Sequence, residues 1–208
     1  MPVRRSAAAA ATSPPVPRSR LDVDARRRQL LALGTALFGS RPYDEVSIDE
    51  VARTAGISKG LLYHYFPTKR DFYVATVREA AAELVARTKR PEQMMDPLER
   101  LRTGLDAFFD YVAEHGTAYE NLLRSGIGSD TEVAAILDET RETFSTRLIE
   151  KLAVRDDLGR LALRGWVGFV EAATLGWLGS RDRVSREALR DMVIRVAIDV
   201  VKSLERKS

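Results

Sequence analysis

Closely spaced helix-start and helix-stop signals in the first third of the chain constrain its fold more than any other feature. Ser47 and Glu50 form an S-x-x-E capping box, which predicts the start of a short helix. Gly56 suits the left-handed residue that follows a helix end. Ser58 can cap a second short helix, and Pro67 stops it. Two short helices joined by a turn that contains glycine predict a helix-turn-helix.

The rest of the chain also has helical spacing of its apolar residues, with no strand alternation and no internal repeat. We therefore predict an all-α fold of about nine helices. It comprises an N-terminal three-helix module with the helix-turn-helix over residues 21–68 and a larger helical body over residues 69–208. Beyond the first three helices, we expect helices over about 69–89, 96–115, 119–124, 129–153, 157–179 and 185–206.

Residues 1–20 are expected to form a disordered basic tail. Arg4 and Arg5 precede a run of five alanines, as in a signal peptide, but this run is shorter than a signal h-region. The prolines that follow block helix formation. The basic residues of the tail could attract phosphate weakly and without sequence preference. Alternatively, the tail could be a solvated segment with no role in function.

Charge and composition narrow the classes of function. Residues 1–71 hold 12 Lys and Arg against 7 Asp and Glu, and the remaining residues hold 21 against 23. A basic first third on a near-neutral body is expected when one end of a protein meets nucleic acid. The chain has no cysteine and two histidines, far apart at His64 and His115, so we expect no disulfide, no metal site and a cytoplasmic location. No enzyme motif is present, and we expect neither catalysis nor a cofactor.

The predicted second short helix, with the sequence SKGLLYHYF, carries most of the functional argument. Leu62 and Phe66 lie four residues apart and can anchor the helix on the core. The opposite side then presents hydroxyl, ammonium, phenol and imidazole groups, which suit phosphate oxygens and base edges. His64 could instead be a half-buried structural histidine. Tyr65 is equally compatible with packing in the core and with a contact to DNA. The residues on the outer side are Ser58, Lys59, Gly60, Tyr63 and His64.

Residues 30–71, including LFGSRPYDEVSIDEVARTAGISKGLLYHYFPTKRD, closely resemble the N-terminal signature of TetR-family regulators. The resemblance includes the Leu37–Phe38 pair, Tyr43 before the second helix, and the LYHYF run. Leu61 is a departure, because the family often has a small or hydroxylated residue there. The leucine could contact a thymine methyl or lose a phosphate bond. The resemblance implies DNA contacts from Ser47, Ser58, Lys59, Gly60, Tyr63, His64 and Lys69, with Leu61 as a further candidate.

The last two expected helices are unusually apolar. The segment from Leu161 to Ser180 is apolar almost all round, but Arg164 and Glu171 would be costly inside a bilayer, so we expect no membrane span. In the TetR family the last two helices pair with their copies in a four-helix dimer interface. The resemblance therefore implies a homodimer that binds a pseudo-palindromic, double-stranded DNA operator.

The resemblance also implies that residues 21–68 are a DNA-binding domain and that residues 69–208 are an effector-binding and dimerisation domain. The fifth to eighth helices are expected to enclose a pocket for a small and largely apolar effector. Arg164 lies two turns before Glu171, so the two could neutralise each other directly or across a bound molecule. The predicted function is a ligand-released repressor. The alternatives are an activator or an architectural or partner-controlled DNA-binding protein without an effector. Candidate pocket residues are Phe108, Phe109, Tyr111, Tyr119, Leu122, Phe144, Trp166, Phe169 and Glu171.

Overall fold

The computed structural model describes residues 20–89, 96–124 and 130–205. The predicted tail therefore lies outside the described residues, except for Arg20, where the first helix begins. The described ranges form α-helices and one short 3-10 turn at Tyr43–Glu45, without a strand, which confirms the all-α prediction. The helices are α1 Arg20–Ser40, α2 Ile48–Thr54, α3 Lys59–Tyr65, α4 Lys69–Arg87, α5 Pro97–Glu114, α6 Gly116–Arg124, α7 Thr131–Lys151, α8 Asp157–Leu178 and α9 Arg186–Glu205.

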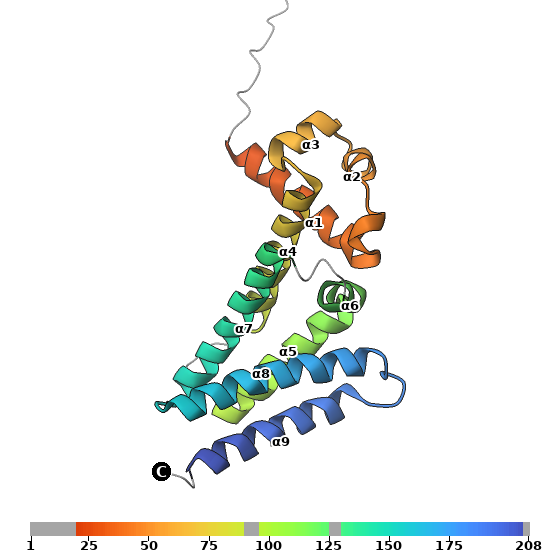
Figure 1. The fold of residues 1–208 in the computed structure, drawn as a ribbon. Helices are drawn as coiled ribbons and strands as arrows, with labels where there is room; N and C mark the ends of the chain where they lie inside the picture. Colours follow the sequence, from red (N-terminus) through yellow and green to blue (C-terminus); the bar gives the residue numbers. More distant parts are fainter. Residues whose placement is uncertain (1–19, 90–95, 125–129, 206–208) are drawn as a thin grey trace, which may run out of the picture.

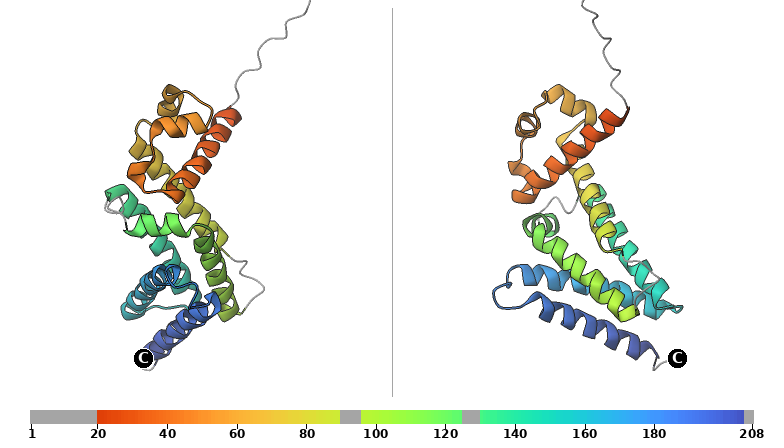
Figure 2. Two further views of the ribbon diagram at one scale, coloured as in Figure 1. Left: turned by 90° about the vertical axis from the view of Figure 1, so that its right-hand side faces the viewer. Right: turned by 180° about the vertical axis from the view of Figure 1, so that it is seen from behind.

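The helices form a small head and a larger body (Figure 1). Helices α1, α2 and α3 make the head, and α4 runs from the head down into the body beside α7. Helices α8 and α9 lie side by side at the end of the body farthest from the head, as the two further views also show (Figure 2). The head therefore reaches the rest of the molecule mainly through α1 and α4.

The capping signals in the head are nearly all confirmed. The backbone N–H of Glu50 donates to Ser47 Oγ at 3.1 Å, and Gly56 has a left-handed φ of +66°. The backbone N–H of Leu61 donates to Ser58 Oγ at 3.1 Å. The second half of the predicted capping box is wrong, because the Glu50 carboxylate accepts from Arg41 Nη2 at 2.6 Å and does not return to the backbone of Ser47.

The start of α7 differs from the prediction. We expected this helix to begin at about residue 129, which lies outside the described residues. In the structure Asp130 is the N-cap, and its carboxylate accepts from the backbone N–H groups of Glu132 and Val133. A carboxylate at this position also interacts favourably with the positive end of the helix dipole.

Two apolar clusters hold the molecule together, and α4 contributes to both. The first joins the head to the upper half of α4 and to the start of α7, with Phe72 and Val133 completely buried. The second lies between α5, α8 and α9 and includes Leu84 near the end of α4. Helix α4 therefore connects the head to the body by apolar packing near both of its ends. None of the described helices is long and apolar enough to span a membrane.

Candidate DNA-binding surface and effector cavity

Helix α3 has one buried side and one exposed side, as its sequence predicts. Leu62 is completely buried and Phe66 is 3% exposed, and both belong to the apolar cluster of the head. Leu61 and Tyr63, the neighbours of Leu62, are 40% and 39% exposed. A seven-residue helix is too short to be stable alone, so this packing fixes the orientation of the exposed side chains.

The structure leaves most of the predicted DNA-contacting residues accessible. Lys69 is half-buried at the start of α4, and the other candidates are exposed. His64 is exposed, so the alternative of a half-buried structural histidine is wrong. Tyr65 is half-buried and packs against the core of the head, which accounts for it without a DNA contact. The exposed candidates are Ser47, Ser58, Lys59, Gly60, Leu61, Tyr63 and His64.

Two candidate cations of this surface already have partners in the free protein. Lys59 Nζ lies 2.9 Å from a carboxylate oxygen of Asp49 on α2, and this hydrogen-bonded pair raises the pKa of Lys59. Lys69 Nζ lies 4.2 Å from the centre of the Tyr43 ring, in a cation–π contact. Both contacts restrict the positions of these two cations in the free protein.

The two adjacent leucines of α3 provide a matched test of this arrangement. We expect Leu62→Ala to lower the free energy of unfolding by about 2–5 kcal/mol, because it removes a completely buried side chain and leaves a cavity. Leu61→Ala should change it by no more than about 0.5 kcal/mol, because Leu61 is largely exposed. Urea denaturation of both variants measures the two values, and equal losses would contradict the assigned orientation of α3.

A cavity of about 610 Å³ runs through the body. Its lining comes from α1 and from every helix between α4 and α9, and most of it is apolar. The volume lies within the range of about 300–1,000 Å³ that is typical of small-molecule sites. Seven of the candidate pocket residues line it: Phe108, Tyr111, Tyr119, Leu122, Phe144, Trp166 and Glu171.

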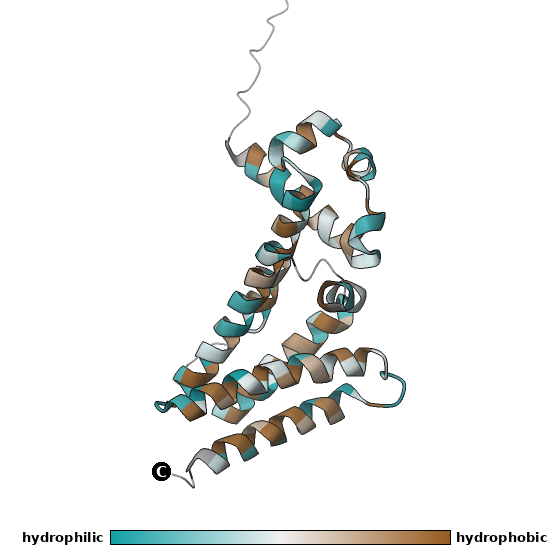
Figure 3. Ribbon diagram, viewed as in Figure 1, coloured by the Kyte–Doolittle hydropathy of each residue, from teal (hydrophilic) through white to brown (hydrophobic). Residues whose placement is uncertain are grey.

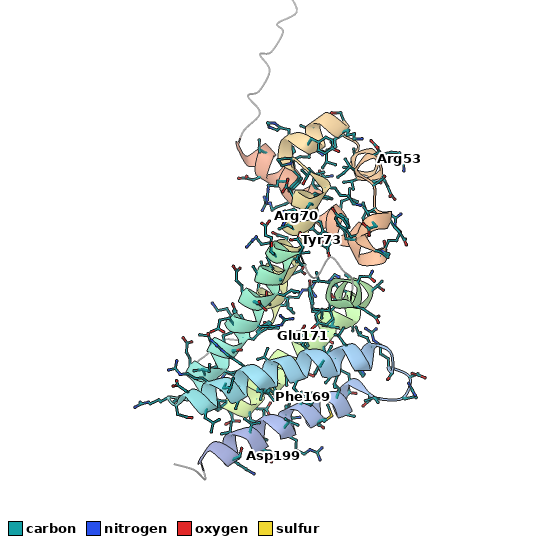
Figure 4. The ribbon with its side chains drawn as sticks, viewed as in Figure 1. Arg53, Arg70, Tyr73, Phe169, Glu171 and Asp199 are labelled. Atoms are coloured by element: carbon teal, nitrogen blue, oxygen red, sulfur yellow. The ribbon has the colours of Figure 1, made fainter. Side chains whose placement is uncertain are left out.

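The other two candidate pocket residues do not line the cavity, so this part of the prediction is wrong. Phe109 is completely buried and packs against the Trp177 ring, with the ring centroids 6.2 Å apart. Phe169 is 37% exposed, and Figure 4 shows it and Glu171 on different sides of α8. Helix α8 is apolar on both sides, so periodicity did not distinguish its inner side from its outer one.

The predicted partner of Glu171 is also wrong. Arg141 on α7 binds the Glu171 carboxylate with two hydrogen bonds of 2.7 Å, whereas the exposed Arg164 donates to Glu142. The two-fold hydrogen bonding raises the pKa of Arg141. Burial raises the pKa of Tyr119, which also lines the cavity and is affected by the Glu171 charge. The Arg141–Glu171 pair therefore places charged groups on the mostly apolar wall of the cavity.

A second ion pair, which sequence reasoning did not identify, joins the start of α4 to the start of α7. Arg70 Nε and Nη2 donate to the two carboxylate oxygens of Asp130 at 2.6 and 2.7 Å. The Arg70 guanidinium lowers the pKa of Asp130 to about 2. Figure 4 shows Arg70 where α4 leaves the head. This ion pair connects Arg70, which follows Lys69, directly to the start of α7 in the body.

The outer side of α8 is open and apolar. Leu161 is 67% exposed, and a Cβ added at Gly165, Gly168 or Gly176 would meet nothing within 4 Å. These residues and Phe169 recur at helical spacing along one side. In Figure 3 hydrophobic segments recur along both α8 and α9. An exposed apolar side of this length is typical of a protein–protein interface.

Comparisons with known proteins agree with this architecture. Residues 30–76 match the model of the bacterial regulatory proteins of the tetR family, and residues 97–199 match that of the tetracyclin repressor-like C-terminal domain. A crystal structure of a tetR-family transcriptional regulator from Streptomyces coelicolor is 33% identical, with a TM-score of 0.74, over 85% of this chain and 79% of that one. This chain belongs to the TetR family.

The family membership shows that the chain is a DNA-binding transcriptional regulator and not an enzyme. Relatives of this TetR-family regulator have different regulatory effects. The HTH-type transcriptional activator FasR of Mycolicibacterium smegmatis is 25% identical over 86% of this chain and 84% of its own. The HTH-type transcriptional repressor KstR2 of Mycobacterium tuberculosis is 33% identical over 45% of this chain and 47% of its own.

Proposed function

We propose that this regulator binds a pseudo-palindromic operator as a homodimer and that a small, largely apolar molecule in the cavity releases it. The observation that carries the proposal is the position of α4. It begins at Lys69 beside the candidate DNA-binding surface, and residues between Tyr73 and Leu84 along it, with Thr88 directly after it, line the cavity. A ligand that fits better when α4 is displaced would favour a different position of the head.

The homodimer is supported by the exposed apolar side of α8. Glycines with open space above them allow a second helix to approach closely, and Leu161 and Phe169 provide apolar area for that contact. Part of the apolar side of α9 is already buried within one protomer, while Val196 and Val200 remain partly exposed. A two-fold pairing of α8 and α9 would bury these residues and hold two heads at a fixed separation.

The DNA contacts are proposed for the candidates named from the sequence: Ser47, Ser58, Lys59, Gly60, Leu61, Tyr63, His64 and Lys69. Seven are exposed on the head, and α3 presents five of them from a rigid base provided by Leu62. Polar side chains from a short helix of this kind can reach base edges in the major groove, while the flanking cations bind phosphate.

The experiment that tests this function measures binding to DNA from immediately upstream of the protein's own gene, in a salt titration against random DNA. We expect tight binding to the upstream fragment and a footprint with two-fold symmetry. Equal and steeply salt-dependent binding to both fragments would contradict sequence-specific recognition. Operator affinity that does not change at saturating concentrations of a cavity ligand would contradict release.

An activator is the second candidate. The similarity to the activator FasR extends over 86% of this chain, which includes the body as well as the head. Transcription measured from the bound promoter with and without the protein separates the two, since an activator raises the rate and a repressor lowers it. The same DNA-binding surface and cavity serve either function.

A further inference from the structure

The charges on the cavity wall are strongly one-sided. Among the described residues, Glu171 is the only acidic side chain in the lining, and Arg141 already neutralises it. The lining also holds Arg147, Lys151 and Lys202, for which the described part of the chain provides no carboxylate within ion-pair distance. A cavity with this balance of charge attracts anions and disfavours cations.

These three cations lie at one end of the body. Lys151 is the last residue of α7, and Lys202 lies in the last turn of α9. Figures 1 and 2 show both helix ends on the same side, near the C-terminus. Arg147 donates to the backbone oxygen of Val85 at 3.1 Å, close to the end of α4. Cations in a last helical turn also stabilise the helix dipole, but that role does not depend on any ligand.

Much of the rest of the cavity wall is apolar. Leu105 and Phe108 of α5, Trp166 and Val170 of α8, and Val77 of α4 line it, and all five are buried. A bound molecule would therefore meet hydrocarbon along most of its length and positive charge at one end. That distribution matches an amphipathic anion, because each part of the ligand then exchanges water for a complementary surface.

We propose that the cavity binds a long hydrocarbon chain with a negatively charged head, a carboxylate or a phosphate. The chain lies against the apolar wall, and Lys151, Lys202 and Arg147 hold the head. This assignment depends on the proposed function in one respect only, which is that the bound anion acts as the effector. Binding itself requires no DNA.

The test uses four ligands that share a twelve-carbon chain and differ in the head: dodecanoate, dodecyl phosphate, dodecanol and dodecyltrimethylammonium, each below its micelle-forming concentration. Titration of the full chain is followed by calorimetry and by tryptophan fluorescence, to which Trp166 in the cavity wall and Trp177 outside it contribute. We expect at least one anion to bind about five- to tenfold more tightly than the alcohol, and the cation to bind most weakly. Comparing the two anions separates carboxylate from phosphate. If the alcohol or the cation binds as tightly as both anions, the proposal fails.

A pair of double variants locates the head. Lys151→Gln/Lys202→Gln should weaken binding of the preferred anion about five- to tenfold and leave dodecanol binding unchanged. Both lysines are exposed, so the fold should be retained, and circular dichroism checks this. The matched control is Arg155→Gln/Arg183→Gln, which removes the same charge from exposed residues outside the lining. Equal loss of affinity in both double variants would overturn the assignment.

Adding operator DNA separates this inference from the proposed function. Anion binding with unchanged operator affinity would contradict ligand release and support the ligand class. Release by dodecanol alone, with no preference for an anion, would support ligand release and contradict the ligand class.

Discussion

A Gly168→Arg variant is expected to be monomeric and to bind its operator at least about 100-fold more weakly, because linking two binding units typically contributes a factor of about 10²–10⁴. Gly168 is exposed on the outer side of α8, and a Cβ built there meets no atom within 4 Å. The monomer therefore has room for the arginine. A partner helix packed on this side would not, and the charge would be buried in an apolar contact.

Analytical ultracentrifugation measures the oligomeric state, and a titration of operator DNA measures the affinity. The matched control is Ala135→Arg, which places the same side chain at an exposed position on α7. We expect the control to remain dimeric and to bind normally. A dimeric Gly168→Arg protein with full operator affinity would show that α8 does not form the interface.

The second large effect is expected from Tyr63→Ala, which should weaken operator binding by roughly 30-fold or more. Loss of a base or phosphate contact typically costs about 1–3 kcal/mol, and in a homodimer the loss occurs twice. Tyr63 is 39% exposed on α3, so the free energy of unfolding should change little. The weakening therefore reflects the interface with DNA.

Tyr63→Phe is the matched control, because it keeps the ring and removes only the hydroxyl. Fluorescence anisotropy with operator and random DNA gives both affinities. Normal binding by Tyr63→Phe would assign the effect to the ring, and equal weakening of both variants would assign it to the hydroxyl. Normal operator binding by Tyr63→Ala would remove this residue from the proposed surface.

Local features of this molecule could be predicted from the sequence because neighbouring residues determine them. The hydrogen bonds of Ser47 and Ser58 to backbone N–H groups three residues on are confirmed, and so is the left-handed Gly56. The inward side of α3 followed from the spacing of Leu62 and Phe66. Each of these depends on a span of a few residues.

Contacts between helices could not be predicted in the same way. Arg70 and Asp130 are 60 residues apart, and Arg141 and Glu171 are 30 apart, so no spacing pattern connects either pair. Arg164 was predicted as the partner of Glu171 because it lies two turns before it on the same helix. In the structure Arg164 donates to Glu142 on α7 instead. Phe169 was misplaced because the hydropathy of α8 does not indicate which of its two apolar sides faces the cavity.

The pairing of Lys59 with Asp49 has a consequence for discrimination between DNA sequences. An unpaired lysine contributes favourable binding free energy at any phosphate that it contacts, whatever the sequence of the DNA. In the proposed DNA contact Lys59 would leave a carboxylate oxygen that lies 2.9 Å away, so it would exchange one anion for another and fewer counterions would be released. Asp49 would thereby lower the favourable free energy of binding to non-specific DNA. Contacts with the bases would then supply a larger share of the binding free energy at the operator. Because a genome holds a large excess of non-specific sites, an acidic residue beside α3 would lower the fraction of the protein that is bound at them.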